Sequence, residues 1–588
     1  MHKRPRQDDA PPTSGSSKKP REAVLGSSSS SSSSSSFSSS SSSHVDILIV
    51  GAGPTGLGAA ARLSQSGHSD WRLVEARDGP GGLAYTTTTP EGFMFDTGGH
   101  VIFSHYSFFD ELIDAAVGGN GPEHWNSRQR VSHVLCRGVW VPYPFQKNLS
   151  FLPLEDQEKC LLGAIDASVK AAASSSTKPV NFDEWILRVM GEGIANIFMR
   201  PYNFKVWACP PSAMQCGWLG ERVATVNAKE LVSDVLHNRA ADRWGPNASF
   251  RFPTRGGTGK IWKDVAAKCC GPQQHQQYDT KVVGVDTNKK EVTMEGKRGE
   301  QSVLTYNKLL TTMPLDQFLQ LCDKEVKDAT VDTWNTTTTK MNGGEAAASK
   351  DTTHDAAAAT PSVGLVHSSS HIIGLGIRGT HEHGDKCWQY FPDDDCPFYR
   401  CTVFTNYSND HAPEESVCLP TIIRGNGTVP ADATPKTGPY FSLMLEVSES
   451  QEYKPVDAAL IMLEGGLNVS KVVLDTIQGC VNTGMMKATD EVVSIHYERL
   501  EYGYPTPSLG RDSALDVALP LLKKKSIWSR GRFGAWKYEV ANQDHSCMQG
   551  VEAVDNMLTG SLETTVNYPG IVNKRGGKNV DIHFVGGQ

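Results

Sequence analysis

Several features that would place this chain in a particular class are missing from its 588 residues. No apolar run approaches the roughly 18–20 residues needed to cross a membrane. The polar N-terminus also has no apolar segment of the kind that secretory signals carry. Both absences predict a cytoplasmic protein without a membrane partner. The net charge of −8 argues against the basic surface that nucleic-acid binding requires.

Cysteine is sparse and shows no pairing pattern. The 13 cysteines are odd in number and scattered, and no two of them form a C-x-x-C pair. Closed zinc sites are built from such pairs, so the sequence predicts no metal centre. Scattered thiols also suit a reducing compartment better than a disulfide framework.

Two low-complexity segments lie outside the predicted folded parts. Residues 1–44 contain an almost unbroken serine tract, which cannot bury enough surface to offset its ordering entropy and is predicted to be a disordered tail. Its basic clusters at 3–6 and 18–21 could act as a bipartite nuclear-import signal, although a solvated tail is the simpler interpretation. Residues 331–362, rich in Thr and Ala, are predicted to form a surface insertion.

The remaining sequence alternates between predicted strands and helices. A buried strand is expected over 45–50, a helix over 56–64 and a second strand over 71–75. Helical spacing returns at 152–170, 182–199 and 546–559. Further strands are predicted at 281–285, 292–294, 308–312, 372–377, 441–447 and 492–497. This alternation indicates a mixed α/β class.

A glycine-rich turn joins the first strand to the first helix. It reads G-x-G-x-x-G, from Gly51 through Gly53 and Thr55 to Gly56. The first glycine permits a tight turn, the second lets the backbone approach a pyrophosphate, and the third lets the helix pack closely. Glu75 ends the next strand, 19 residues after Gly56, where a carboxylate binds ribose hydroxyls. Together these features predict a bound dinucleotide.

The segments that follow favour FAD over a nicotinamide. Two more glycine turns lie close behind the first, and they contain Gly82, Leu83, Gly99 and His100. A late segment then opens a helix with Asn542, Gln543 and Ser546, offering a second helix N-terminus to the cofactor. We therefore predict a discontinuous Rossmann-like FAD-binding domain of the glutathione-reductase type.

The predicted domain boundaries follow from these segments. The FAD-binding domain is assembled from 45–105, 225–330 and 511–575. A mostly helical domain covers 106–224, and an antiparallel sheet domain covers 363–510 and lines the substrate cleft. Residues 576–588 form a C-terminal tail.

Six further strings carry a resemblance to one family. In chain order they are GGHVIFSHY (98–106), WVPYPFQ (140–146), FMRPYNFKVW (198–207), WLGERV (218–223), GYPTP (503–507) and WSRGRFGAW (528–536). From about residue 45 to 569, the chain resembles UDP-galactopyranose mutase of the eukaryotic type. The resemblance implies an isomerase that interconverts UDP-galactopyranose and UDP-galactofuranose and so supplies the galactofuranose donor for glycoconjugates. It also implies a covalent adduct between the sugar's anomeric carbon and N5 of reduced FAD, with NADPH as the reductant.

The same resemblance implies catalytic and substrate-binding residues. Arg200 and Arg378 match two diphosphate-binding arginines, whose planar guanidinium groups suit phosphate oxygens. His100 matches a residue whose backbone faces the flavin. Substrate contacts are further expected from Tyr143, Gln146, Trp185, Asn227, Tyr504 and Tyr538. Additional flavin contacts are expected from Val282, Arg532, Asn542, Gln543 and Ser546.

The sequence departs from the family pattern at three positions. Lys260 and Ala541 replace expected glycines, and His367 occupies a position where a substrate-contacting tyrosine is expected. None of these changes removes a group that the chemistry requires, but His367 would weaken diphosphate binding.

Two alternatives remain open from the sequence. An FAD-dependent oxidase or desaturase could share this fold, but it would have little use for paired arginines beside the flavin. A non-catalytic GDI-like binding protein could share it too, but it would not need the intact glycine set. A homo-oligomer is also compatible with the sequence.

Overall fold

The computed structural model describes residues 43–173, 178–240, 245, 248–331, 365–574 and 583–584. By its contacts the chain separates into residues 1–41 and a compact unit from Ser42 to Gln588, and only the second is described below. The predicted serine-rich tail up to residue 42, the predicted insertion over 331–362 except its first residue, and most of the predicted C-terminal tail lie outside the described residues.

A seven-stranded sheet forms the centre of the predicted cofactor domain. Its order is β10-β11-β12-β1-β2-β9, and β21 also pairs with β12. The strands are β1 (Ser43–Val50), β2 (Trp71–Val74), β9 (Gln276–Gln277), β10 (Thr280–Asp286), β11 (Glu291–Gly296), β12 (Gln301–Thr311) and β21 (Ile527–Ser529). The pairings among β21, β12, β1, β2 and β9 are parallel. β11 pairs antiparallel with β12, and β10 pairs antiparallel with β11.

Strand β1 is apolar throughout because both of its faces are covered. Ile47 and Ile49 pack into one core, and Leu48 and Val50 pack into another. The first core is built with α1 (Pro54–Gln65), α2 (Ser107–Val117), α7 (Gly257–Lys268) and α12 (Gln543–Thr559). The second is built with α8 (Leu315–Leu321) and α11 (Arg511–Lys524). The predicted strand at 45–50 and helix at 56–64 are confirmed.

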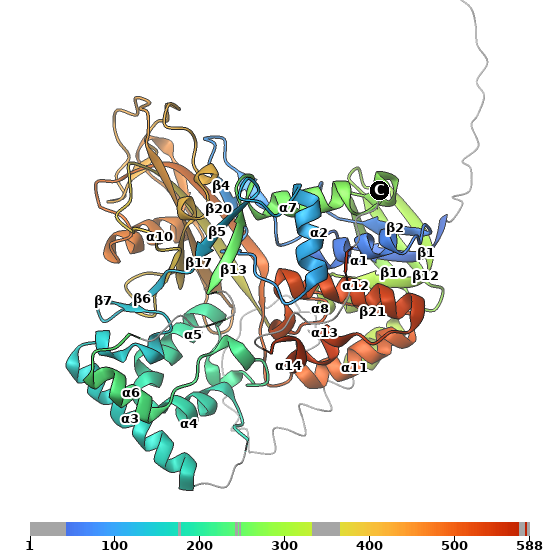
Figure 1. Ribbon diagram of the computed structural model, residues 1–588. Helices are drawn as coiled ribbons and strands as arrows, with labels where there is room; N and C mark the ends of the chain where they lie inside the picture. The colour runs from blue at the N-terminus through green and yellow to red at the C-terminus, as the bar shows by residue number, and fades with distance from the viewer. Residues whose placement is uncertain are drawn as a thin grey trace, which may run out of the picture. The chain divides into compact units, whose positions relative to one another are not determined.

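An eight-stranded sheet forms the second layer, in the order β16-β20-β13-β17-β15-β14-β6-β7 (Figure 1). Its strands are β6 (Ser132–Cys136), β7 (Val139–Pro142), β13 (His367–Arg378), β14 (Trp388–Tyr390), β15 (Arg400–Val403), β16 (Ile423–Arg424), β17 (Tyr440–Glu449) and β20 (Glu491–Pro505). All neighbours are antiparallel except β14 and β6.

The segment predicted as helical also supplies part of this sheet. β6 and β7 form a short hairpin whose turn has positive φ at Arg137 and Gly138. Strands of four and five residues give too few alternations to stand out in a sequence. The same segment begins with α2, which packs in the cofactor-domain core.

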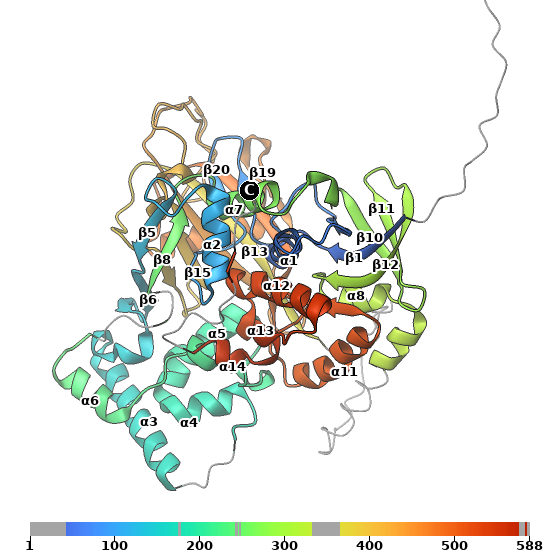
Figure 2. The same cartoon turned by 45° about the vertical axis from the view of Figure 1, so that its right-hand side comes forward.

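Four helices group together, apart from α1 and α12, in both views (Figures 1 and 2). Three come from this segment, α3 (Leu154–Ala173), α4 (Phe182–Ile194) and α5 (Arg200–Trp207), and the fourth, α6 (Ala228–Leu236), comes from the stretch predicted to belong to the FAD-binding domain. The helix predicted over 182–199 is interrupted at Gly191, where φ is 79° and ψ is 173°. A Cβ at Gly191 would lie 2.0 Å from the Gly163 carbonyl oxygen of α3, so the close contact between α3 and α4 requires a glycine.

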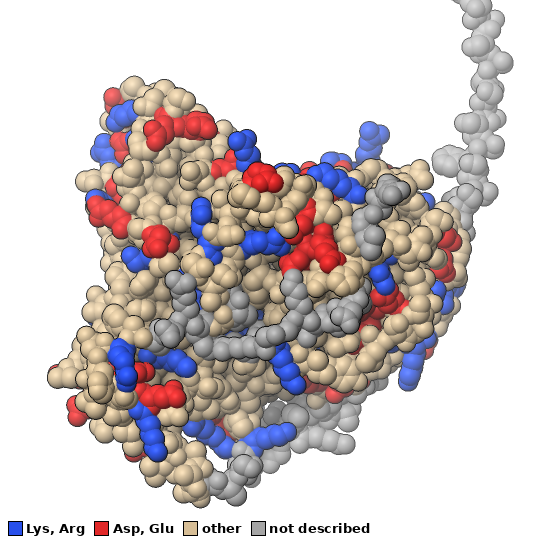
Figure 3. Space-filling model, viewed as in Figure 1, with Lys and Arg blue, Asp and Glu red and all other residues tan. Residues whose placement is uncertain are grey.

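Charged side chains of both signs are interspersed over the face seen in Figure 3. Within the described ranges, none of the helices combines the length and the apolar composition that a membrane crossing requires.

Candidate functional site

The predicted dinucleotide loop lies between β1 and α1. Gly51 has a φ of 105°, and a Cβ on Gly56 would lie 1.9 Å from the Gly51 carbonyl oxygen. Gly53 caps α1 without a side-chain acceptor, so the first-turn N–H groups remain available to a ligand. At the end of β2, Glu75 accepts a 2.7 Å hydrogen bond from the Ala52 N–H. The backbone thus has the form expected of a pyrophosphate cradle, and the carboxylate predicted to bind ribose lies beside it.

A second glycine turn and the late helix reach the same loop. A Cβ on Gly53 would lie 3.6 Å from Gly82 Cα, and one on Gly550 of α12 would lie 1.9 Å from the Thr55 carbonyl oxygen. Leu83, beside Gly82, packs against the second core. Helix α12 starts at Gln543, three residues before its predicted start. The N- and C-terminal parts of the predicted cofactor site are therefore in contact, as FAD binding requires.

The first turn of α12 carries the late cofactor residues. Asn542 is its N-cap and makes no side-chain capping bond, and Ser546 is buried. Gln543 accepts a 2.7 Å hydrogen bond from Trp262 Nε1. Arg532 donates to the carbonyls of Gly503 and Ala541. Val282 is buried on β10, which borders the sheet at the opposite edge from β9.

Asp544 links α12 to the segment that follows His100. One of its carboxylate oxygens accepts from both the backbone N–H and Nδ1 of His105, at 3.1 and 2.7 Å. Burial opposes ionisation, but the charge of His545 and the bonds from His105 outweigh it and lower the pKa of Asp544 to about 2. Among the described residues, His105, Asp544 and His545 form the one group whose ligand atoms lie close enough together to hold a metal ion. Its carboxylate is engaged in holding His105, so we assign it no metal.

Arginine and tyrosine side chains gather beside the glycine turn at 98–100. Arg400, with 20% of its side chain exposed, lies close to Gly99: a Cβ there would be 3.2 Å from Arg400 Nη2. The Tyr399 and Tyr504 hydroxyls are 3.2 Å apart. Arg532 lies 4.9 Å above the Tyr504 ring and 5.7 Å from that of Tyr538. The guanidinium groups of Arg400 and Arg532 therefore lie beside the same group of tyrosines.

Glu446 of β17 connects this cluster to the turn beside the predicted flavin. Its Oε1 accepts from Arg400 Nε and Nη2 at 2.8 and 2.6 Å and from the Gly99 N–H at 3.0 Å. Its Oε2 accepts from the Tyr399 hydroxyl. Burial lowers the pKa of the neighbouring His100 to about 4, so this imidazole is neutral at pH 7.

Arg378 lies far from this cluster, contrary to the expectation from the sequence. Ser368, near the start of β13, pairs with Tyr504. Arg378 is ten residues further along the same strand, or about 33 Å at the usual rise. Its guanidinium donates to Glu491 at 2.8 Å and to the carbonyls of Lys436, Thr437 and Leu419. The position beside the tyrosines belongs to Arg400 instead.

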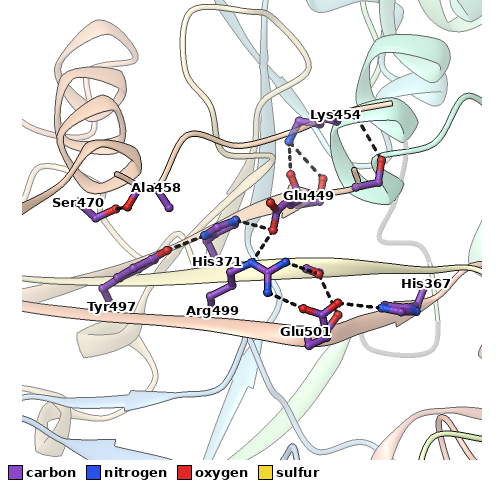
Figure 4. Close-up of polar contacts among 12 residues, drawn as sticks. His367, His371, Glu449, Lys454, Ala458, Ser470, Tyr497, Arg499 and Glu501 are labelled. Carbon is purple, nitrogen blue, oxygen red and sulfur yellow. Dashed lines mark hydrogen bonds and ion pairs between the residues drawn. The ribbon is translucent and has the colours of Figure 1, made fainter. Parts of the chain in front are cut away.

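His367 is also placed outside the cluster. Its ring stacks on Tyr502 at 4.2 Å, and its Nε2 lies 3.4 Å from Glu501 in a polar network with Arg499 (Figure 4). A further tyrosine, Tyr390, lies near the cluster, with its ring 5.4 Å from that of Tyr143. His367 therefore does not substitute for a substrate-facing tyrosine, and the expected weakening of diphosphate binding has no structural basis.

Arg200 bonds to residues outside the cluster. It makes a paired contact with Asp183, at 2.6 and 2.7 Å, and donates to Asn196. Trp207, seven residues later on α5 and so about 10 Å along the helix, packs against Tyr504 and Tyr538. Arg200 also lines a cavity of about 1080 Å³ beside α3 and α4.

The other predicted substrate contacts are spread over a wider area. Tyr143 joins the aromatic cluster and lies under Arg130 at 4.8 Å. Trp185 lines the same cavity as Arg200. Gln146 donates to the Ala224 carbonyl at 2.8 Å. Asn227 caps α6 by accepting from the N–H groups of residues 229 and 230, so the structure does not bring it to the cluster.

The two replaced glycines are accommodated locally. Lys260 pairs with Asp264 one turn along α7. Ala541 has a φ of −115°, which an alanine adopts without strain.

Sequence reasoning missed Arg400, Tyr399, Tyr390 and Glu446. The string at 398–400, Phe-Tyr-Arg, mixes aromatic and cationic residues as the strings at 198–207 and 528–536 do. This similarity could have identified Arg400.

Comparison with known proteins gives concordant findings. Residues 49–112 match the NAD(P)-binding Rossmann-like domain. A crystal structure of reduced UDP-galactopyranose mutase is 40% identical, covers 92% of this chain and 100% of that chain, and superposes with a TM-score of 0.74. A probable UDP-galactopyranose mutase of Klebsiella pneumoniae is 25% identical over 184 residues, which make up 29% of this chain and only 42% of the bacterial protein.

More distant structures share the fold alone. A double mutant of putrescine oxidase is 14% identical, covers 88% of this chain and 100% of its own, and has a TM-score of 0.50.

Proposed function

The chain belongs to the UDP-galactopyranose mutase family, and we propose on this premise that it interconverts UDP-galactopyranose and UDP-galactofuranose by the eukaryotic-type, FAD-dependent route. The observation that carries the proposal is the cluster of Arg400, Arg532 and tyrosine hydroxyls beside the Gly99 turn. An oxidase of the same fold has only fold likeness in its favour.

The residues at the cradle fit FAD. Gly51, Gly53 and Gly56 would admit the pyrophosphate, Glu75 the ribose, and the first turn of α12 the remainder of the cofactor. When bound and reduced, the flavin would supply through N5 the nucleophile that holds the anomeric carbon while the sugar ring opens and recloses. From the family resemblance we further propose NADPH as the reductant and the cytoplasm as the compartment.

The diphosphate is the group that the arginine–tyrosine cluster suits best. Departure of UDP leaves negative charge on the diphosphate oxygens, and guanidinium groups stabilise such charge. We propose that Arg400 takes the role first expected of Arg378. Arg200 would complete the site by exchanging its bond to Asp183 for one to phosphate. Tyr504 and Tyr538 would donate their hydroxyls, and Tyr143 and Trp185 would flank the uridine.

His100 would act through its backbone and not as an acid or base. Its lowered pKa, about 4, keeps the ring neutral at pH 7. The Gly99 N–H is held by Glu446, so the turn is fixed relative to Arg400. The residues therefore suit a reaction in which binding and positioning matter more than proton transfer by histidine.

Anaerobic turnover tests this function. UDP-galactofuranose would be supplied to dithionite-reduced protein and the pyranose followed by chromatography. Product should form only with reduced protein. Arg400→Ala should lower kcat/KM about 10²–10³-fold because a transition-state cation is lost. A fully reducible yellow protein that forms no product would sink the assignment.

Arg378→Ala is the matched control. Its side chain is fixed by Glu491 and backbone carbonyls, remote from the cluster. Its kcat/KM should therefore stay within about threefold of wild type. A loss in Arg378→Ala as large as that in Arg400→Ala would contradict the placement of the diphosphate.

A further inference from the structure

One buried lysine joins the two segments that carry the proposed diphosphate arginines. Arg200 begins α5, and Arg400 begins β15. Lys205, only 5% exposed, lies on α5 five residues after Arg200, about 7.5 Å along the helix. Its ammonium donates to the carbonyls of Asp393 and Cys396, at 2.7 and 2.8 Å, and contacts Cys396 Sγ at 3.6 Å.

The acceptors of this ammonium are neutral. Among the described residues Lys205 has no direct ion pair, although the carboxylate of Asp393, whose carbonyl it binds, is near enough to interact with its charge. A buried charge without a directly paired counter-ion costs free energy that an apolar side chain of similar size would avoid. What the lysine provides is a fixed separation between α5 and the turn at 393–396, which ends four residues before Arg400.

The C-terminal end of α5 is also hydrogen-bonded to the stretch of chain that carries Glu446. Its last carbonyls lack partners within the helix, and the Ser448 and Ser450 hydroxyls donate to those of Lys205 and Ala208. Ser448 shares a face of β17 with Glu446, because side chains on a strand alternate with period two, and Ser450 directly follows the last residue of that strand. The strand that holds Arg400 through Glu446 therefore also holds the end of α5.

We propose that Lys205 is a positioning residue for the diphosphate site, setting the distance between Arg200 on α5 and Arg400 on β15. The inference rests on the proposed function. Without the ammonium, the turn at 393–396 loses its donors and Arg400 can shift relative to Arg200. Misplacement by about 1 Å is enough to weaken such a site severely.

The test is binding of UDP to the full-length, FAD-loaded protein, measured by calorimetry. Lys205→Met keeps the length of the side chain and removes the donors, and should raise the Kd for UDP about tenfold. Lys290→Met is the control. The Lys290 ammonium donates to the Asn307 carbonyl at 3.0 Å and to the Ser526 hydroxyl at 3.2 Å, in the cofactor-sheet part of the chain and not at α5, β17 or the turn at 393–396. Its variant should bind UDP within about twofold of wild type.

The decisive measurement is a double-mutant cycle with Arg400→Ala. If Lys205 acts by positioning Arg400, adding Lys205→Met to Arg400→Ala should weaken UDP binding by less than about twofold. Equal tenfold losses in both backgrounds would overturn the inference, since the lysine would then act independently of Arg400. Should Lys205→Met fail to fold, Ser448→Ala replaces it in the same cycle, with about threefold weaker binding expected in the wild-type background alone.

Two outcomes separate this inference from the proposed function. A wild-type protein that does not bind UDP would overturn both. A wild-type protein that binds UDP, with Lys205→Met binding equally well, would overturn the positioning role alone.

Discussion

Glu446 is the single residue on which most of the candidate site depends. It is 3% exposed and accepts from the Gly99 backbone, two nitrogens of Arg400 and the Tyr399 hydroxyl. A buried carboxylate and its donors are stable only when all of them are present, because removing one partner leaves the others unsatisfied. The turn proposed to face the flavin and the arginine proposed to bind the diphosphate are thus held by one side chain.

Glu446→Gln should therefore affect both parts of the site. The amide keeps the shape but loses the charge and opposes the Arg400 guanidinium with its own N–H groups. We expect a loss of about 3–5 kcal/mol in stability, together with a changed flavin absorption spectrum and weaker UDP binding. Thermal unfolding, spectroscopy and calorimetry measure these effects.

Glu449 offers a control on the opposite face of β17. It pairs with Arg499 and contacts His371 (Figure 4), away from the turn at 98–100. Glu449→Gln should leave the flavin spectrum and UDP binding unchanged. A spectral change equal to that of Glu446→Gln would show that strand stability, and not the Gly99 contact, is responsible.

At this scale the sequence predicts residues well where the constraint is local. The glycine motif is recognisable because the local geometry of the turn requires each of Gly51, Gly53 and Gly56. Arg400 is different, because its role depends on pairing with Glu446, 46 residues away, and on contact with Gly99, 301 residues away. Arg378 looked equivalent in the sequence because the length of β13, which carries it away from Tyr504, cannot be judged from the arginine's neighbours.

Among the elements, the crossing of α1 and α12 has little space for an added side-chain atom. A Cβ on Gly58 would lie 2.5 Å from the Cys547 carbonyl oxygen, and one on Gly550 would lie 1.9 Å from that of Thr55. Both neighbours are backbone atoms, which cannot rotate away. The two helix N-termini proposed to face the cofactor therefore keep their relative position only while these glycines are present.

Gly550→Ala should push α12 away from α1. We expect FAD occupancy to fall by about half or more and stability to drop by about 1–3 kcal/mol from overpacking. The ratio of flavin to protein absorbance and the Tm report these changes.

Gly570→Ala serves as the comparison. A Cβ at Gly570, in α14 (Pro569–Val572), meets nothing within 4 Å. FAD occupancy should match wild type in this variant. If Gly550→Ala also retained full occupancy, the crossing would not control the cofactor site.

The elements that were predicted correctly are those with strong periodicity or long apolar runs. β1, α1 and β13 fall in this class. The sequence does not predict the hairpin of β6 and β7, because each strand is short. It predicts a continuous helix over 182–199, because Gly191 is compatible with a helix until α3 packs against it. Tertiary contact, absent from the local sequence, decides both cases.

At the scale of the whole molecule, the cofactor sheet is assembled from separated stretches of chain. β1 and β2 come from the start, β9 to β12 from the middle and β21 from near the end. The proposed FAD contacts are spread over the same stretches. The domain boundaries expected from the sequence remain a prediction, but this distribution implies that the cofactor stabilises more than one local segment.

Removal of FAD should accordingly lower the stability of the whole folded unit. Adding FAD back at 100 times its Kd should restore about 2.7 kcal/mol, visible as a single upward shift of the thermal transition. A Tm that does not respond to FAD would contradict cofactor binding to the native state at these residues.

The face of β17 that carries Glu446 and Ser448 has one further consequence. The Gly99 turn, Arg400 and the end of α5 are all held by this one strand, so they depend on its pairing register as well as on its residues. A slip of one position would turn both side chains to the other face at once. Substitutions at these positions remove contacts one by one, whereas a single inserted or deleted residue upstream within the strand would remove them together. This strand should therefore conserve its length more strictly than its composition.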